Sequence, residues 1–232
     1  MEIYQKEIQI APEGLSTGDL FRALQDAAGE QSSLVHQGAD DLAAKGLMWV
    51  VIRYQLSIAR WPQGGERVAL QTWPGSTRHG MMPRYYRVTD AGGAACIQGC
   101  GVWAVVDRVS RKMVSPEEHG VVLETLVTGW ESPMPRPVRK QETDRSRAFT
   151  VPAEYLDSNG HMNNTRYYDL AEQCIGRSAR DHGLRTVSTE HLTEALCGET
   201  MQLHWGQSGE RFYIAGQEGD TTVFRMILEY GE

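Results

Sequence analysis

The sequence of 232 residues has few cysteines, no long apolar runs and a deficit of positive charge. Its four cysteines show no CxxC spacing and its histidines form no zinc-binding pattern, so we expect reduced thiols, no metal and no cofactor. No apolar run reaches the length of a membrane-spanning helix, and the charged, alternating N-terminal segment lacks the pattern of a signal or transit peptide. The net charge of −7 argues against nonspecific nucleic-acid binding. These absences predict a cytoplasmic globular protein that neither spans a membrane nor binds nucleic acid.

The first half of the chain begins with a strand-like segment and a helix. Ser16-Thr17-Gly18-Asp19 is a capping-box-like start, after which apolar residues recur at helical spacing as far as Leu34. A long strand follows at residues 47–60, where apolar side chains alternate strictly from Met48 to Ile58. Three more strands are expected, at residues 66–73, 84–90 and 94–106.

The second half repeats this order of elements. Asn163-Asn164-Thr165 offers a helix N-cap, Gly183 is expected to end the helix, and a long strand is expected at residues 186–196. Further strands are expected at residues 200–206, 211–217 and 221–230. The repeat predicts an α+β fold, a double hot-dog, in which two long helices are each wrapped by a curved antiparallel sheet and the sheets join into one. Two unrelated α+β domains are the weaker alternative.

The domain organisation follows from this repeat. We expect an N-terminal hot-dog at residues 1–130, a linker rich in proline and charge at residues 131–147, and a C-terminal hot-dog at residues 148–232. Because a chain with two such units already mimics a dimer, a monomer and a homodimer are both compatible with the sequence.

Polar side chains concentrate just before the second helix. In an extended segment Asp157, Asn159 and His161 would share one side, pointing toward the helix N-terminus. Backbone N–H groups near Asn163 and Asn164 would be free there to stabilise an oxyanion. The alternative is an Asx turn and N-cap whose hydrogen bonds are purely structural.

Glu194 is a second candidate. It shares strand parity with Leu192 and Leu196, and a carboxylate on an apolar face usually has a partner or a chemical role. The alternatives are an ion pair with an arginine, or a position at a strand end that reaches water.

Basic residues gather in the middle of this acidic chain. They could attract an acidic partner at short range, although a solvated basic face is the alternative for any one of them. The candidates are Arg108, Arg111, Lys112, Arg136, Arg139 and Lys140.

Several segments carry a resemblance to one family. DSNGHMNNTRYYDLAE resembles the D-x-N-x-H-x-N-N-x-x-Y segment of plant and bacterial acyl-acyl-carrier-protein (acyl-ACP) thioesterases. The first half is similar to the same family in LMWVVIRYQLSIARWPQGGERVALQTWPG and in RVSRKMVSPEE after VWAVVD. The similarity covers nearly the whole chain, including the double hot-dog plan.

The resemblance implies that the chain hydrolyses fatty acyl-ACP thioesters to free fatty acid and carrier protein. By position, Asp157, Asn159, His161 and Glu194 match the family's catalytic residues. The first half lacks this set, which implies one active site per chain. The implied partner is an acyl carrier protein bearing a fatty acyl-phosphopantetheine, with the basic residues as its candidate contacts.

The resemblance also implies that the first half supplies the acyl-chain pocket, for which Trp49, Val51 and Trp103 are candidates. An acyl-CoA thioesterase and a non-catalytic acyl-thioester sensor remain alternative functions. Direct attack by water and covalent attack by a carboxylate both stay open, and the preferred acyl chain is not readable from side-chain volumes.

Overall fold

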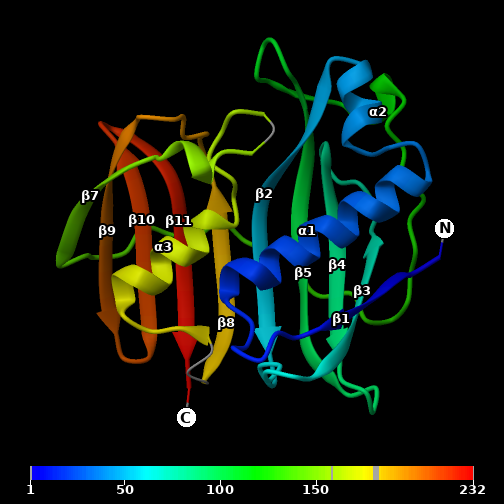
Figure 1. The fold of residues 1–232 in the computed structure, drawn as a ribbon. Coiled ribbons are helices and arrows are strands. Elements are labelled where there is room, and N and C mark those ends of the chain that lie inside the picture. The colour runs from blue at the N-terminus through cyan, green and yellow to red at the C-terminus, as the bar shows by residue number, and fades with distance from the viewer. Residues whose placement is uncertain (1, 158, 180–182, 232) are drawn as a thin grey trace.

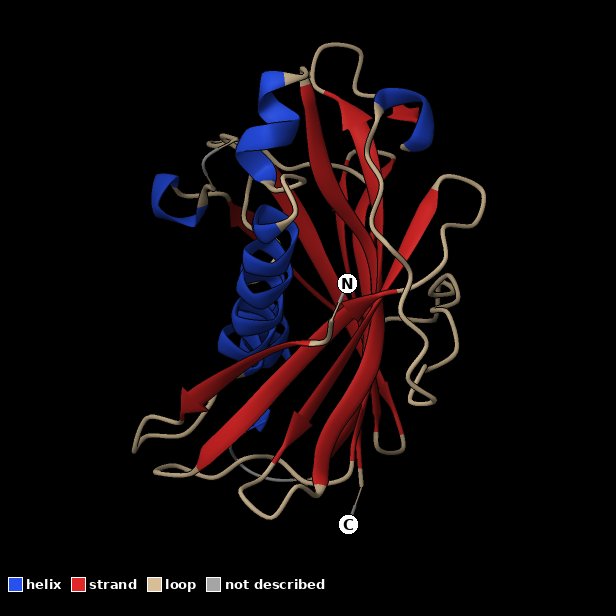
Figure 2. Cartoon of the chain, turned by 90° about the vertical axis from the view of Figure 1, so that its right-hand side faces the viewer, coloured by secondary structure: helices blue, strands red, loops and turns tan. Residues whose placement is uncertain are grey.

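The computed structural model describes residues 2–157, 159–179 and 183–231, which form one antiparallel sheet with helices α1 and α3 on the same face (Figures 1 and 2). The helices are α1 (Thr17–Leu34), α2 (Ala39–Ala44) and α3 (Arg166–Ile175), with 3-10 turns η1 (Glu117–His119) and η2 (Ala153–Tyr155). The strands are β1 (Tyr4–Gln9), β2 (Leu47–Ile58), β3 (Arg67–Pro74), β4 (Met81–Thr89), β5 (Ala95–Asp107), β6 (Met113–Val114), β7 (Arg145–Thr150), β8 (Leu184–His191), β9 (Thr200–Ser208), β10 (Arg211–Glu218) and β11 (Thr221–Tyr230).

The strand order is β1-β3-β4-β5-β2-β8-β11-β10-β9-β7, with β6 beside β5. Each half contributes one block of strands, and the two long strands that follow the helices, β2 and β8, pair with each other at the centre. The predicted α+β double hot-dog with a joined sheet is therefore confirmed.

The two helices differ in length. Helix α1 has 18 residues and begins at the predicted cap, where the Ser16 side chain accepts a hydrogen bond from the Asp19 backbone N–H. Helix α3 has only 10 residues, because Gly176 adopts the left-handed conformation at its C-cap, so the prediction of a helix reaching Gly183 was wrong. No helix in the described part of the chain is long and apolar enough to cross a membrane.

The helices pack on each other as well as on the sheet. The Phe21 ring of α1 stacks on the Tyr168 ring of α3, with centroids 3.8 Å apart. The Tyr168 hydroxyl also makes a hydrogen bond of 2.9 Å with the hydroxyl of Thr189 on β8. These contacts draw both halves into one hydrophobic core.

Strand β2 departs from the strict alternation expected of it. Its register with β5 shifts between Val51 and Arg53, which is a β-bulge. After the bulge in chain order, the alternating side chains of Tyr54, Leu56 and Ile58 are buried. Before the bulge, Val51, which has the opposite parity, is buried. The bulge thus changes which side chains of β2 face the helices.

The segment after β5 crosses the sheet face opposite the helices (Figure 2). Val138 packs there against Tyr213 and Ala215, in a small cluster separate from the main core. The last residues of the predicted linker already belong to β7, the edge strand of the sheet, which pairs with β9.

A buried carboxylate joins the two halves and this crossing segment. Glu190 of β8 lies opposite Arg53 of β2, and its Oε1 accepts a hydrogen bond of 2.9 Å from Arg53 Nε. Its Oε2 accepts one of 3.1 Å from the Val138 backbone N–H. The Glu190 side chain is only 4% exposed, so the charge depends on these partners.

Replacing this carboxylate should destabilise the whole protein. We expect Glu190→Ala to lower the free energy of unfolding in urea by about 3 kcal/mol, because Arg53 is left with its charge unpaired at the joint. The control is Glu210→Ala, which removes an exposed ion pair with Arg177 and should cost less than about 1 kcal/mol. Equal losses in the two variants would contradict this account of the joint.

Candidate functional site

A cavity opens where the two central strands separate. The β2–β8 ladder runs from the Ser57–Thr186 pair to the Arg53–Glu190 pair, and beyond it the chains diverge. The gap holds a cavity of about 130 Å³, which we call the junction cavity. It is lined by Met48, Trp49, Val50, Val51, Asp157, Asn159, His161, Met162, Asn164, Tyr167, His191, Leu192, Thr193 and Glu194.

Strand β8 ends earlier than expected, which places Glu194 in a loop. The backbone N–H groups of Leu192 and Thr193 both donate to the carbonyl of Val223, an irregularity that ends the ladder. Leu192 and Leu196 are each 44% exposed, so the prediction of Glu194 on a buried apolar strand face was wrong. Both alternatives describe it better, because Glu194 forms an ion pair with Arg111 and its side chain, beyond the end of the strand, is 38% exposed.

The segment before α3 is a tight turn and not an extended strip. Asp157 Oδ1 accepts hydrogen bonds from the backbone N–H groups of Asn159 (2.8 Å) and His161 (3.3 Å). Gly160 permits the turn with a φ of +81°. The turn docks on the Glu194 loop through a hydrogen bond of 2.8 Å from the Met162 N–H to the Ala195 carbonyl. Asp157 therefore shapes the turn that carries the other side chains.

Glu194 and His161 line the junction cavity and contact each other, and Arg111 contacts both. Glu194 Oε2 lies 3.3 Å from His161 Nε2, and Glu194 Oε1 accepts a hydrogen bond of 3.1 Å from Arg111. Arg111 also lies 3.1 Å from His161 Nε2. In a neutral imidazole, Nε2 either lacks a proton and accepts a hydrogen bond from Arg111, or carries the proton and donates one to Glu194. The tautomer of His161 therefore decides which of the two hydrogen bonds forms. The three side chains therefore form one hydrogen-bonded group.

Arg111 was expected only on the carrier-protein surface. It lies in the loop after β5 with a φ of 57°, and this left-handed backbone helps direct its side chain to Glu194. Its neighbour Arg108 donates a hydrogen bond of 3.3 Å to Asn159 Oδ1. No sequence pattern linked this loop to the DSNGHMNN segment, because the two are brought together only by the pairing of β2 with β8.

The start of α3 uses its two asparagines differently. Asn163 Oδ1 accepts hydrogen bonds from the N–H and hydroxyl of Thr165, and its own N–H donates to the Tyr155 carbonyl. Asn163 thus fits the structural alternative. Asn164 lines the junction cavity, and within the described residues its backbone N–H has no hydrogen-bond partner.

Two further residues of the cavity were not singled out from the sequence. Burial, with the charge of Glu194 as a smaller cause, raises the pKa of Tyr167, which remains a neutral phenol. Burial lowers the pKa of His191 to about 4. His191 is half-buried as a residue, but both of its ring nitrogens are buried, with no hydrogen-bond partner in the described structure.

A second cavity, of about 170 Å³, lies between α1 and the first block of strands, and we call it the N-terminal cavity. Trp49 and Trp103 line it, and Trp49 also lines the junction cavity, so the two cavities share one side chain as a wall. Val51, the other predicted pocket residue, faces the junction cavity. Within the described residues, no group of three or more His, Cys, Asp or Glu side chains is placed to hold a metal ion.

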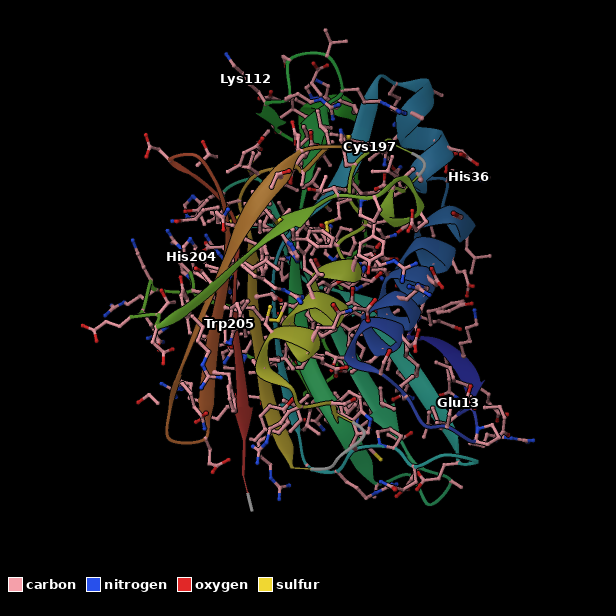
Figure 3. All side chains as sticks on the ribbon, turned by 60° about the vertical axis from the view of Figure 1, so that its left-hand side comes forward. Glu13, His36, Lys112, Cys197, His204 and Trp205 are labelled. Atoms are coloured by element: carbon pink, nitrogen blue, oxygen red, sulfur yellow. The ribbon has the colours of Figure 1, made fainter. Side chains whose placement is uncertain are left out.

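The basic residues divide between two places. Arg108, Arg111 and Lys112 follow β5 beside the junction cavity; Figure 3 shows Lys112 toward the same end of the molecule as Cys197, with Glu13 toward the other end. The second group flanks Val138 on the sheet face opposite the helices and consists of Arg136, Arg139 and Lys140.

His191 should make stability depend on pH. The unfolded chain takes up a proton near pH 6.5, whereas the folded chain takes it up only near pH 4, so this contribution to stability is complete above pH 6.5 and is lost as the pH falls toward 4. We expect wild type to lose about 2 kcal/mol more between pH 7 and pH 5 than His191→Phe, measured by urea unfolding. The exposed-histidine control His36→Gln should behave as wild type. Identical pH dependence in His191→Phe and wild type would refute the assignment.

Solved structures match this fold along nearly its whole length. The acyl-ACP thioesterase from Bacteroides thetaiotaomicron superposes with a TM-score of 0.81 at 20% identity, covering 99% of this chain and 98% of that one. The 12:0-ACP thioesterase from Umbellularia californica gives a TM-score of 0.80 at 18% identity, covering 99% and 97%. At these identities the comparison establishes the shared double hot-dog fold.

Sequence comparison points to the same group of proteins. The chloroplastic palmitoyl-acyl carrier protein thioesterase of Arabidopsis thaliana is 26% identical over 169 residues, which are 68% of this chain and 40% of that protein. The dodecanoyl-[acyl-carrier-protein] hydrolase of Cinnamomum camphora is 22% identical over 207 residues, 82% of this chain and 54% of that protein. The chain thus spans only part of the length of these relatives.

Two family models divide the chain between them. The model of the acyl-ACP thioesterase N-terminal domain matches residues 2–121, and the model of the C-terminal domain matches residues 138–226. These matches follow the two structural halves and together cover most of the sequence, so the chain belongs to the acyl-ACP thioesterase family.

Proposed function

We propose that this protein hydrolyses fatty acyl-ACP thioesters, releasing a free fatty acid and the carrier's thiol. The observation that carries the proposal is the contact of Glu194 with His161 in the lining of the junction cavity, close to the start of α3, with Arg111 bound to both. A carboxylate, an imidazole and a free backbone N–H, here that of Asn164 just before the helix, are groups that serve acyl transfer.

Each group has a role in this scheme. Glu194 takes the proton of a water whose oxygen forms a bond to the thioester carbon, and the Asn164 N–H donates to the developing oxyanion. The C–S bond then breaks as the oxyanion reforms the carbonyl, and the proton taken by Glu194 passes through His161 to the departing sulfur, which restores both side chains. Asp157 positions His161 and Asn159 through the turn. Direct attack by Glu194, with a later hydrolysis of the acyl-enzyme, uses the same groups and remains the second route.

The acyl chain is proposed to run from the junction cavity past Trp49 into the N-terminal cavity. The shared wall at Trp49 supports this path, and Trp103 lines its far part. Val51 contacts the chain near the thioester. The first predicted unit, residues 1–130, then binds the chain, and the second, residues 148–232, supplies most of the catalytic groups.

The carrier protein is proposed to dock beside the loop that follows β5. Arg108 and Lys112 are next to the junction cavity and would meet the acidic carrier close to its phosphopantetheine arm. Arg136, Arg139 and Lys140 are exposed on the sheet face opposite the helices. The carrier protein could reach them only by contacting this protein at a second, separate surface.

Two alternatives share the fold and the cavities. An acyl-CoA thioesterase would use the same catalytic groups, since pantetheine is common to both carriers, but would not need a protein-docking surface. A non-catalytic acyl-thioester sensor would bind the thioester without releasing a thiol. The contact of Glu194 with both His161 and Arg111 favours hydrolysis over sensing.

Removing either carboxylate tests the mechanism. We expect Glu194→Gln to lower kcat for thiol release by at least about 100-fold, because the proton acceptor is lost. We expect Asp157→Ala to lower it by about 10-fold to 100-fold through misplacement of His161. Glu210→Gln, at an exposed position in the β9–β10 connection, is the matched control and should keep the wild-type rate. Near-normal rates in both cavity variants would overturn the mechanism.

Charge reversal tests the carrier. We expect Lys112→Glu to raise KM for acyl-ACP about tenfold at low salt, to leave KM for the matching acyl-CoA nearly unchanged, and to lose its effect as salt rises. Arg136→Glu makes the same charge change on the other sheet face and should leave both KM values near wild type. A preference for acyl-CoA in wild type, unaffected by Lys112→Glu, would support the acyl-CoA alternative instead.

A further inference from the structure

The N-terminal cavity contains polar groups that an ordinary fatty acyl chain would leave unused. Most of its wall is apolar, with Trp49, Met82, Trp103 and Leu123 among its members. Arg84 of β4 also lines it, although an aliphatic chain offers a guanidinium no hydrogen-bond acceptor.

Arg84 is a buried cation held only by neutral groups. It is 4% exposed and donates to Gln31 Oε1, to Ser32 Oγ at 3.1 Å and to Thr72 Oγ1 at 3.4 Å. Among the described residues, no carboxylate forms an ion pair with it. Burial lowers the pKa of the Arg84 guanidinium, but an arginine keeps its charge in proteins. Buried charges are normally paired, so this one lacks its counter-charge.

Gln25 of α1 provides an independent observation at the same cavity. Its side-chain Nε2 is buried and has no acceptor in the described structure. Among the described residues, the cavity therefore presents a cation without a negatively charged partner and an N–H donor without an acceptor. A ligand that carries negatively charged oxygen atoms would satisfy both.

We propose that the N-terminal cavity binds a carboxylate attached to an aliphatic chain, with the carboxylate on Arg84 and Gln25 and the chain along the apolar wall. Two molecules offer this chemistry: a free fatty acid bound with its head inward, and an acyl thioester with a second carboxylate at the far end of its chain. Guanidinium and carboxylate form the strong, charge-assisted pair that the site lacks. This binding site does not require hydrolysis.

The first experiment compares two ligands of equal length on the wild-type protein. We expect decanoic acid to bind about tenfold more tightly than 1-decanol by isothermal titration calorimetry at neutral pH. This comparison needs no variant, because Arg84 also links α1 to β3 and its removal could prevent folding. Equal affinities for acid and alcohol would overturn the inference.

Variants locate the carboxylate. Arg84→Met and Gln25→Leu should reduce the preference for the acid, whereas Arg87→Met, which removes a cation of β4 that lies over the Trp130 ring, should leave it intact. Arg111→Met should also leave it intact. A preference lost in Arg111→Met but kept in Gln25→Leu would place the carboxylate in the junction cavity and overturn the inference.

A kinetic comparison then identifies the source of the carboxylate. If it belongs to the substrate, kcat/KM for an ω-carboxydecanoyl thioester should exceed that for the decanoyl thioester about tenfold, with the advantage lost in Gln25→Leu. If it belongs to free fatty acid, decanoic acid should inhibit hydrolysis, and Gln25→Leu should weaken that inhibition. A protein that binds the acid selectively but hydrolyses no thioester would retain this inference and overturn the proposed function.

Discussion

The ladder between β2 and β8, closed by the buried Arg53–Glu190 pair, joins the two halves and decides where the site can form. On one side of this pair the strands are hydrogen-bonded and the sheet is continuous. On the other side they separate, and the space between residues 48–51 and 191–194 becomes the junction cavity. Because Glu190 also holds the crossing segment at Val138, one carboxylate fixes three parts of the chain relative to each other.

The site is assembled from segments that are far apart in sequence but end at the same opening. Glu194 comes from the loop after β8, His161 from the turn before α3, and Arg111 from the loop after β5. Of these, Arg111 alone belongs to the N-terminal half. The first half thus contributes a charged group to the site in addition to the wall formed by β2, so this arrangement of side chains requires the joined sheet.

The sequence singled out residues that the fold brings to one cavity, although it predicted the wrong local structure for some of them. Asp157, Asn159, His161 and Glu194 all line the junction cavity, as the family resemblance implied. Asp157, Asn159 and His161 lie in a tight turn, whereas strand parity had predicted an extended segment. Glu194 lies in a half-exposed loop, whereas strand parity had predicted a buried strand face. Parity arguments assume an unbroken ladder, and the paired N–H bonds of Leu192 and Thr193 to Val223 end that ladder just before Glu194.

The sequence alone was enough to predict the Ser16 cap of α1 and the repeated order of elements, and to single out the DSNGHMNN segment. Caps, alternation and motifs can be predicted in this way because they involve neighbours along the chain. The early end of α3 is also local, since the Gly176 N–H donates to the carbonyl of Glu172 within the same helix. The bulge in β2 and the roles of Arg111 and His191 were decided by tertiary structure. Each depends on which distant backbone group accepts a hydrogen bond, or on how fully a side chain is buried. Those quantities exist only once the strands of the sheet have paired.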